Sequence, residues 1–204
     1  MKALVISALA ADAEHGAAAQ WALAAALAEH GYEVDLVDCL DVRVIPCTGC
    51  SGCGLKTPGA CAVQDDMQGI YRRMVASDVL VLATPVRFGS YCAELKKVVD
   101  RFQPLMVPIY VLRDGEMHFQ SRYDLPPLVG VGLVRENGGG GTHDDSDGRP
   151  EGQDDEAAAF RFLIGRLAVN VATRHAATTV AAGDELRLRE ELAAVLDDLA
   201  EAAR

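Results

Sequence analysis

The chain has 204 residues, of which 50% are hydrophobic and 24% are charged, and its formal net charge is −11 at pH 7. This composition is typical of a globular protein with a substantial core, and it excludes a disordered chain. Such an acidic chain is a poor partner for nucleic acid, because phosphate binding needs a basic face. The first seven residues are too short an apolar run for a signal peptide, and no later run approaches the ~18 apolar residues of a membrane span. We therefore expect a cytoplasmic protein with neither nucleic acid nor membrane as a partner, in which thiols stay reduced.

The predicted elements begin with a strand–helix–strand unit. Leu4 to Ile6 is an apolar run typical of a buried parallel strand, and an Ala-rich helix is predicted from about Ala17 to Glu29. Gly31 ends that helix, and Tyr32 to Asp38 alternates as a second strand. Two strands joined through a helix imply a right-handed parallel unit.

The next predicted helix comes late, from about Asp65 to Ala76, after a segment rich in cysteine and glycine. A fully apolar third strand follows at Val79 to Ala83. It ends in a turn, Thr84 to Ser90, and a further helix is predicted from about Cys92 to Phe102.

The segment from Pro104 to Pro127 departs from this alternation. Apolar runs at Ile109 to Leu112 and Met117 to Gln120 flank a turn that contains Asp-Gly, which predicts a β-hairpin insertion. We expect the hairpin to lie at a subunit interface or over the site. Leu128 to Val134 is predicted to be the fourth strand.

A glycine- and aspartate-rich stretch, residues 135–153, follows the fourth strand and is expected to be a lid or a loop that contacts a cofactor. The chain then continues with a predicted helix at 154–171, a fifth strand at 178–182 and an amphipathic helix at 184–203. Five strands that alternate with helices predict an α/β fold with a doubly wound parallel sheet, in one domain spanning residues 1–204.

Four of the six cysteines lie between the second strand and the next helix. Cys47, Cys50, Cys53 and Cys61 follow the spacing C-x2-C-x2-C-x7-C, with glycines and a proline between them. Three thiolates at this spacing can surround one compact object, as in the bacterial ferredoxin run that holds a [4Fe–4S] cluster. Structural zinc sites usually use two well-separated C-x2-C pairs instead. Zinc and metal-free, redox-active thiols are the alternatives to a cluster.

The cysteine segment and three further loops lie at the carboxyl ends of the strands, where open α/β sheets bind ligands. The loop from Ala8 to Gly16 should hold a phosphate against the first helix, or else be an ordinary turn. It offers Ser7, His15, Gly16 and backbone N–H groups, but no Lys or Arg. The turn after the third strand presents backbone amides, an aromatic edge and Arg87. That arginine is free to neutralise a phosphate or to pair with Glu94.

The sequence resembles a known family in three segments. They are the four-cysteine motif, the run Asp65-Asp66-Met67 that continues to Ile70, and the stretch from Ser77 through Thr84-Pro85-Val86 to Leu95-Lys96 and Asp100-Arg101. Together they resemble the NAD(P)H-dependent FMN reductases of the flavodoxin-like group and, within it, the iron–sulfur flavoproteins.

This resemblance implies the flavodoxin-like strand order 2-1-3-4-5, and an FMN bound noncovalently with its phosphate in the first loop. The isoalloxazine would lie against the turn after the third strand and the loop after the fourth. The residues expected to contact FMN are Ser7, His15, Gly16, Thr84, Pro85, Val86, Arg87, Phe88, Gly89, Ser90, Asn137 and Gly138. The implied cluster ligands are Cys47, Cys50, Cys53 and Cys61. NAD(P)H is the implied co-substrate, and a homodimer or homotetramer is the implied assembly.

The chain departs from the family pattern in three places. Its first loop lacks the usual Ser/Arg/Asn/Thr set for the phosphate and contains Asp12 and Glu14. Arg87 stands where Tyr is common, and the glycine-rich loop is longer and more acidic than usual.

The leading hypothesis is an FMN-dependent NAD(P)H oxidoreductase that passes electrons between FMN, a [4Fe–4S] cluster and an acceptor. A nicotinamide or a ferredoxin-like protein would be the donor, and a small molecule or a protein the acceptor. One alternative is a cluster-free quinone, nitro or azo reductase that depends on FMN. The other is a non-catalytic redox or metal sensor on the same fold. No catalytic acid or base is assigned, because the cofactor carries the chemistry.

Overall fold

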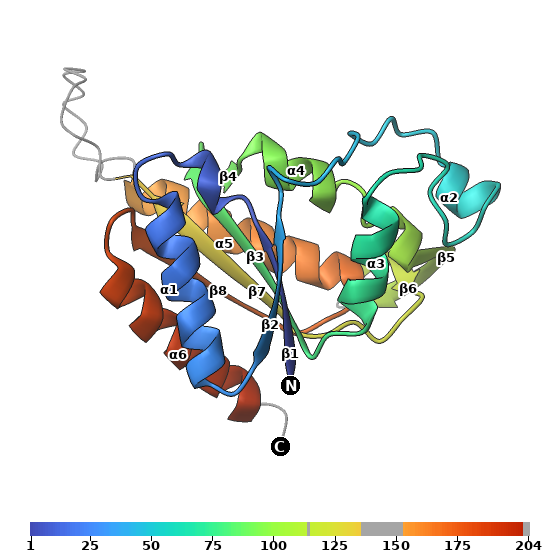
Figure 1. Cartoon of the computed structure of the whole chain (residues 1–204). Coiled ribbons are helices and arrows are strands. Elements are labelled where there is room, and N and C mark those ends of the chain that lie inside the picture. The colour runs from blue at the N-terminus through green and yellow to red at the C-terminus, as the bar shows by residue number, and fades with distance from the viewer. Residues whose placement is uncertain (114, 136–152, 202–204) are drawn as a thin grey trace, which may run out of the picture.

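A parallel sheet forms the centre of the molecule in a computed structural model that describes residues 1–113, 115–135 and 153–201 (Figure 1). The strands lie in the order β2-β1-β3-β7-β8. Their bounds are β1 Lys2–Ser7, β2 Glu33–Asp38, β3 Val79–Arg87, β7 Leu128–Val134 and β8 His175–Ala181. A short antiparallel strand, β4 (Ser90–Tyr91), pairs with the end of β3. The predicted strand order is confirmed, with β7 and β8 as its fourth and fifth strands.

Helices cover both faces of this sheet. The α-helices are α1 Gly16–Glu29, α2 Gly52–Leu55, α3 Met67–Val75, α4 Ala93–Val99, α5 Gln153–Val171 and α6 Glu185–Glu201. The described residues also include two 3-10 turns: η1 (Leu9–Ala11) lies between β1 and α1, and η2 (Gln103–Leu105) follows α4. Within the described part of the chain, no helix is both long and apolar enough to cross a membrane.

Alternate residues of the strands pack into two separate apolar layers, because successive side chains of a strand point to opposite faces. Val5 and Val81 belong to the layer shared with α1 and α6, whereas Leu4 and Leu82 belong to the layer shared with α3, α4 and α5. Both β3 and β7 are buried along almost their whole length, which explains their uniformly apolar sequences.

Two glycines of β7 allow α5 to approach the sheet closely. A Cβ on Gly130 would lie 2.5 Å from a side-chain carbon of Ile164, and a Cβ on Gly132 would lie 2.9 Å from a ring carbon of Phe160, both in α5. Hydrogen alone therefore fits at these two positions.

The predicted hairpin is confirmed as a separate two-stranded antiparallel sheet, β5 (Met106–Arg113) with β6 (Glu116–Ser121). Tyr110 and Phe119 stack across it, with ring centroids 4.7 Å apart. The register of β5 shifts between Val107 and Tyr110, which indicates a β-bulge at Pro108. Ile109, Tyr110, Leu112 and Met117 leave much of their apolar surface exposed.

Two local features differ from the sequence-based expectation. The third strand continues beyond Ala83 to Arg87, because β7 pairs with it as far as Pro85 and β4 pairs with Val86 and Arg87. The cysteine segment contains the short helix α2, which its glycine-rich sequence did not suggest. α2 begins after Ser51, whose φ of 55° is unusual for a residue other than glycine.

Candidate functional site

The loop after β1 is wound tightly onto itself. Ser7 is fully buried, and its hydroxyl donates a hydrogen bond to Gln20 of α1 (2.6 Å) and accepts one from the Leu9 N–H (3.2 Å). A Cβ on Gly16 would lie 2.0 Å from the carbonyl oxygen of Leu9, so only glycine fits where α1 begins. His15 lies against Gly183 in the turn between β8 and α6. The Ser7 hydroxyl and the N–H groups of His15 and Gly16, all predicted to receive a phosphate, therefore already have hydrogen-bond partners within the protein.

Asp12 is a buried carboxylate in this loop that pairs with two arginines, and its side chain is 1% exposed. One carboxylate oxygen accepts hydrogen bonds from the N–H groups of Glu14 (3.3 Å) and His15 (3.2 Å). The other accepts one from Nε of Arg135 (3.2 Å) and lies 3.6 Å from Nη2 of Arg87. Burial alone would raise the pKa of Asp12, but these hydrogen bonds and the Arg135 charge outweigh it and lower the pKa. The carboxylate is therefore ionised at neutral pH.

The turn after β3 is a two-residue hairpin that projects an aromatic side chain. Phe88 and Gly89 join β3 to β4, and both have positive φ, 52° and 69°. These values match the tight turns that suit paired strands, at some cost in backbone strain for a non-glycine residue. The Phe88 side chain is 96% exposed at the carboxyl edge of the sheet. A flat ligand would find an unpartnered ring there.

Buried contacts hold the base of this turn. Pro85 and Val86 are buried, and the Thr84 hydroxyl accepts a hydrogen bond from the Cys92 N–H (3.1 Å), where α4 begins. Ser90 pairs with Arg87 in the short antiparallel ladder. The carboxylate near Arg87 is that of Asp12, not that of Glu94, so the Glu94 pairing considered from the sequence is wrong. Asn137 and Gly138, also predicted to contact FMN, lie outside the described residues.

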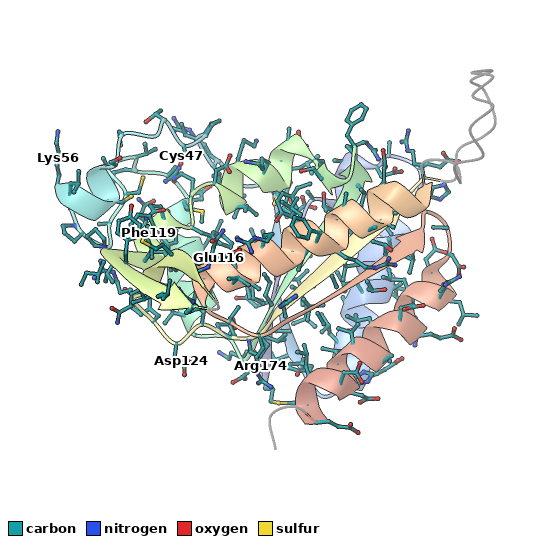
Figure 2. All side chains as sticks on the ribbon, turned by 180° about the vertical axis from the view of Figure 1, so that it is seen from behind. Cys47, Lys56, Glu116, Phe119, Asp124 and Arg174 are labelled. Carbon is teal, nitrogen blue, oxygen red and sulfur yellow. The ribbon has the colours of Figure 1, made fainter. Side chains whose placement is uncertain are left out.

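The four predicted cluster cysteines line one cavity of about 520 Å³. Cys47 and Cys50 are exposed, whereas Cys53 and Cys61 are half-buried. The opposite wall consists of Pro108, Tyr110 and Phe119 of the hairpin, with Asp100, Arg101 and Gln103 also in the lining. Figure 2 shows Cys47 in the cysteine segment above Phe119 of β6, with Lys56 at the outer end of that segment. The remaining two cysteines, Cys39 and Cys92, are buried elsewhere in the core.

Electrostatic interactions between the thiols of this cavity change the pKa of Cys53. The pKa of Cys53 is raised by burial first and then by the charges of Cys61, Cys47 and Cys50. The pKa of Cys50 is lowered, chiefly by a hydrogen bond from the Gly52 N–H and then by the Thr48 side chain. The charges of the other three thiols therefore reach Cys53 within the same cavity.

A buried ion pair closes the base of the cysteine segment. Arg101 forms a bidentate pair with Asp65, at 2.8 and 3.1 Å, and both side chains are buried. The same guanidinium donates to the carbonyl of Ile45 (2.7 Å), and Asp65 accepts from the Ile45 N–H (2.8 Å). Tyr71 donates its hydroxyl proton to the Arg101 carbonyl (2.7 Å). The two ends of the segment are thus fastened to α3 and to the end of α4.

Comparison with known proteins decides the family. The model of the NADPH-dependent FMN reductases matches residues 1–139, which is more than half of the chain. The chain belongs to the NADPH-dependent FMN reductase family.

Relatives of this chain include proteins named for an iron–sulfur cluster. An iron–sulfur flavoprotein of Methanocaldococcus jannaschii is 36% identical over 114 residues, which cover 56% of this chain and 52% of the relative. One of Methanosarcina thermophila is 40% identical over 73 residues, 36% of this chain and 37% of the relative. The matched region spans about half of the first relative's length and less of the second's.

Solved structures of reductases share the fold. An NAD(P)H:quinone oxidoreductase from Methanothermobacter marburgensis superposes with a TM-score of 0.66 at 16% identity, over 95% of this chain and 94% of that one. The central sheet is therefore flavodoxin-like, as the sequence predicted.

The turn after β3 fits a flavin ring, whereas the first loop does not fit the flavin phosphate. The turn with Phe88 offers backbone groups and an open ring at the carboxyl edge. The first loop does not fit a phosphate as it stands, because the Asp12 carboxylate takes the N–H groups of Glu14 and His15 and faces Arg87 and Arg135.

The cysteine cavity offers four thiols to a metal group. Zinc binds each thiolate at about 2.3 Å, which places tetrahedral sulfur ligands roughly 4 Å apart. No three His, Cys, Asp or Glu side chains in residues 1–113, 115–135 and 153–201 form a group that could hold one metal ion. A four-iron cube needs one thiolate at each of its separate irons, so it requires a wider arrangement. Four thiols around a cavity satisfy the chemistry of that donor set.

The sequence did not reveal two features of the site. The contact of Asp12 with Arg135 joins residues far apart in the chain. The sequence also gave no sign that Arg101 forms an ion pair with Asp65, although both residues belong to the segments that carry the family resemblance.

Proposed function

We propose that this chain is an FMN-dependent NAD(P)H oxidoreductase that carries a [4Fe–4S] cluster and passes electrons between FMN, the cluster and an acceptor. Membership of the NADPH-dependent FMN reductase family supports the flavin and nicotinamide part. The observation that carries the cluster part is the placement of Cys47, Cys50, Cys53 and Cys61 around one cavity. The names of the relatives point in the same direction.

A bound flavin would supply hydride and single-electron chemistry, and the protein's task is to bind and orient it. In our proposal, Pro85 to Ser90 supports the flavin ring, with Phe88 against its face or edge. Ser7, His15, Gly16 and Thr84 lie at the same edge of the sheet, and we assign Arg87, which lies 3.6 Å from the Asp12 carboxylate, as the cation for the phosphate. Asn137 and Gly138 complete the expected set.

The cysteine cavity lies beside the hairpin rather than beside this turn, and Figure 1 shows α4 between β4 and α2. We therefore propose a homodimer or homotetramer in which a second copy brings the two sites closer. The exposed apolar side chains of the hairpin, Ile109, Tyr110, Leu112 and Met117, support an interface there.

The test is to purify the protein without oxygen and to quantify iron, acid-labile sulfide and flavin. We expect about four iron atoms and four sulfides per chain. Cys50→Ser should lose most of this iron, whereas Cys39→Ala, which removes a buried thiol outside the cavity, should retain it. Absence of iron from the anaerobic wild-type protein would overturn the cluster part of the proposal.

A second candidate is a cluster-free reductase of quinones, nitro compounds or azo compounds. The lack of a single-ion group among the described residues favours it, since it requires no metal at the cysteines. NAD(P)H oxidation on added FMN, unchanged in Cys50→Ser, would support this candidate. A protein that neither binds flavin nor oxidises NAD(P)H would instead be a redox or metal sensor.

A further inference from the structure

Asp12 is bound as a free anion would be bound. Two backbone N–H groups at the start of α1 and two guanidinium groups surround its carboxylate. The two arginines come from the end of β3 and from the residue after β7, far from Asp12 in sequence. All of these donors lie at the carboxyl edge of the sheet, where α/β proteins receive phosphate groups.

Helix capping alone does not account for this arrangement. An Asp before a helix commonly accepts hydrogen bonds from nearby N–H groups, and those of Glu14 and His15 would satisfy that role. Capping needs neither Arg87 nor Arg135. Pairing of a buried carboxylate with two guanidiniums is instead the pattern of recognition for a negatively charged group.

We propose that the Asp12 carboxylate occupies the position of the flavin phosphate, so that a phosphate monoester binds only by displacing Asp12 from Arg87 and Arg135. This rests on the proposed function, since it places flavin at this edge. Asp12 therefore weakens FMN binding without preventing it, because the phosphate group must first displace the carboxylate, whereas riboflavin, which lacks that group, meets no such competition. Asp12 is the residue that sets this preference.

Asp12→Asn separates the two roles of the residue. The amide oxygen can still accept from the N–H groups of Glu14 and His15, but the negative charge facing the arginines is gone. Glu14→Gln is the matched control, because it removes the same charge from an exposed side chain two residues away. Asp12→Ser is the second variant, which keeps a capping oxygen in a smaller side chain.

The experiment measures FMN and riboflavin affinity by fluorescence titration. In a parallel experiment, thermal unfolding is followed in phosphate and in chloride at equal ionic strength. We expect the ratio of FMN affinity to riboflavin affinity to rise at least tenfold in Asp12→Asn, and to stay at the wild-type value in Glu14→Gln. Phosphate should raise the melting temperature of Asp12→Asn and leave that of the wild type unchanged.

The two measurements distinguish failure of this proposal from failure of the proposed function. Riboflavin binding with an unchanged affinity ratio, and no stabilisation of either Asp12 variant by phosphate, would overturn the role of Asp12. Absence of flavin binding in every variant, with phosphate still stabilising Asp12→Asn, would support the role of Asp12 and refute the flavin function.

Discussion

The carboxyl edge of the sheet and the cysteine arm (residues 47–61) satisfy their polar groups in opposite ways. At the sheet edge, Ser7 and Asp12 are buried and each has partners within the protein. On the arm, Cys47 and Cys50 are exposed, and the charges of Cys61, Cys47 and Cys50 raise the pKa of Cys53. The polar groups of Ser7 and Asp12 at the edge are thus satisfied without a ligand, whereas the arm gathers groups that repel one another when ionised.

This difference shows where each region obtains its shape. The edge inherits its geometry from β1, β3 and β7, which pack between two layers of helices. The arm has few apolar side chains of its own, and Arg101 and Asp65 fasten it at its base. We expect a ligand to rearrange the edge and to complete the arm.

The largest expected effect comes from breaking the fastening pair. Arg101→Leu leaves the Asp65 carboxylate buried without its partner, which typically costs about 3–5 kcal/mol of unfolding free energy. Urea denaturation measures this loss. Lys96→Gln is the control, because it removes only the half-exposed ion pair with Asp100 and should cost less than about 1 kcal/mol. Equal losses in both variants would contradict the assigned role of Arg101.

A smaller loss is expected from crowding the sheet itself. Gly130→Ala would place a methyl group 2.5 Å from Ile164 of α5, and such overpacking costs about 1–3 kcal/mol. Gly69→Ala in α3 is the control, since nothing lies within 4 Å of the added methyl group. That control should stabilise the protein by up to about 1 kcal/mol, because alanine favours helix. A stable Gly130→Ala protein would show that α5 does not pack so closely.

Acid should weaken the sheet edge and the base of the arm together. The pKa values of Asp12 and Asp65 are both lowered in the folded protein from the ordinary value of 3.8. For Asp65, burial opposes the shift, and the hydrogen bonds from Arg101 and from the Ile45 and Met67 N–H groups outweigh it.

The unfolded chain therefore takes up these protons first as the pH falls. The stability from both groups is present above pH 3.8 and is lost as the pH falls through the folded pKa values. Asp12→Asn should reduce the slope of unfolding free energy against pH by up to one proton, about 1.4 kcal/mol per pH unit. Urea denaturation at a series of acidic pH values measures it, and a slope equal to that of the wild type would refute the prediction.

The smallest expected effect concerns the thiols of the arm. Cys50→Ser should change the unfolding free energy of the metal-free protein by less than about 0.5 kcal/mol, because the side chain is exposed. Cys39→Ser should cost about 1–3 kcal/mol, since it buries a hydroxyl in the core. Burial also raises the pKa of Cys39 to about 12. Alkylation mapped by mass spectrometry should therefore modify Cys50 long before Cys39.

Local sequence predicted most of the fold because its signals act over short distances. The bounds of β7 agree with the apolar run Leu128 to Val134, and the Asp-Gly turn correctly predicted the hairpin. The helix α2 escaped prediction because glycine disfavours helix, and here the fold of the arm overrides that preference.

The site was harder to predict because its contacts join distant segments. The sequence identified the four cysteines as a group, and they line one cavity. It also marked Asp12 as an unusual residue for a phosphate loop. The partners of Asp12 could not be identified, because Arg87 and Arg135 meet it only when β1, β3 and β7 align in the sheet.

The bulge at Pro108 in β5 has a consequence for how copies of this chain associate. Proline has no N–H to donate, and the register shift between Val107 and Tyr110 interrupts the regular ladder of the strand. Continuous strand-to-strand addition, which leads to open-ended fibres, is therefore blocked along this part of the hairpin. Association through the side chains of its face can still end in a closed, countable assembly.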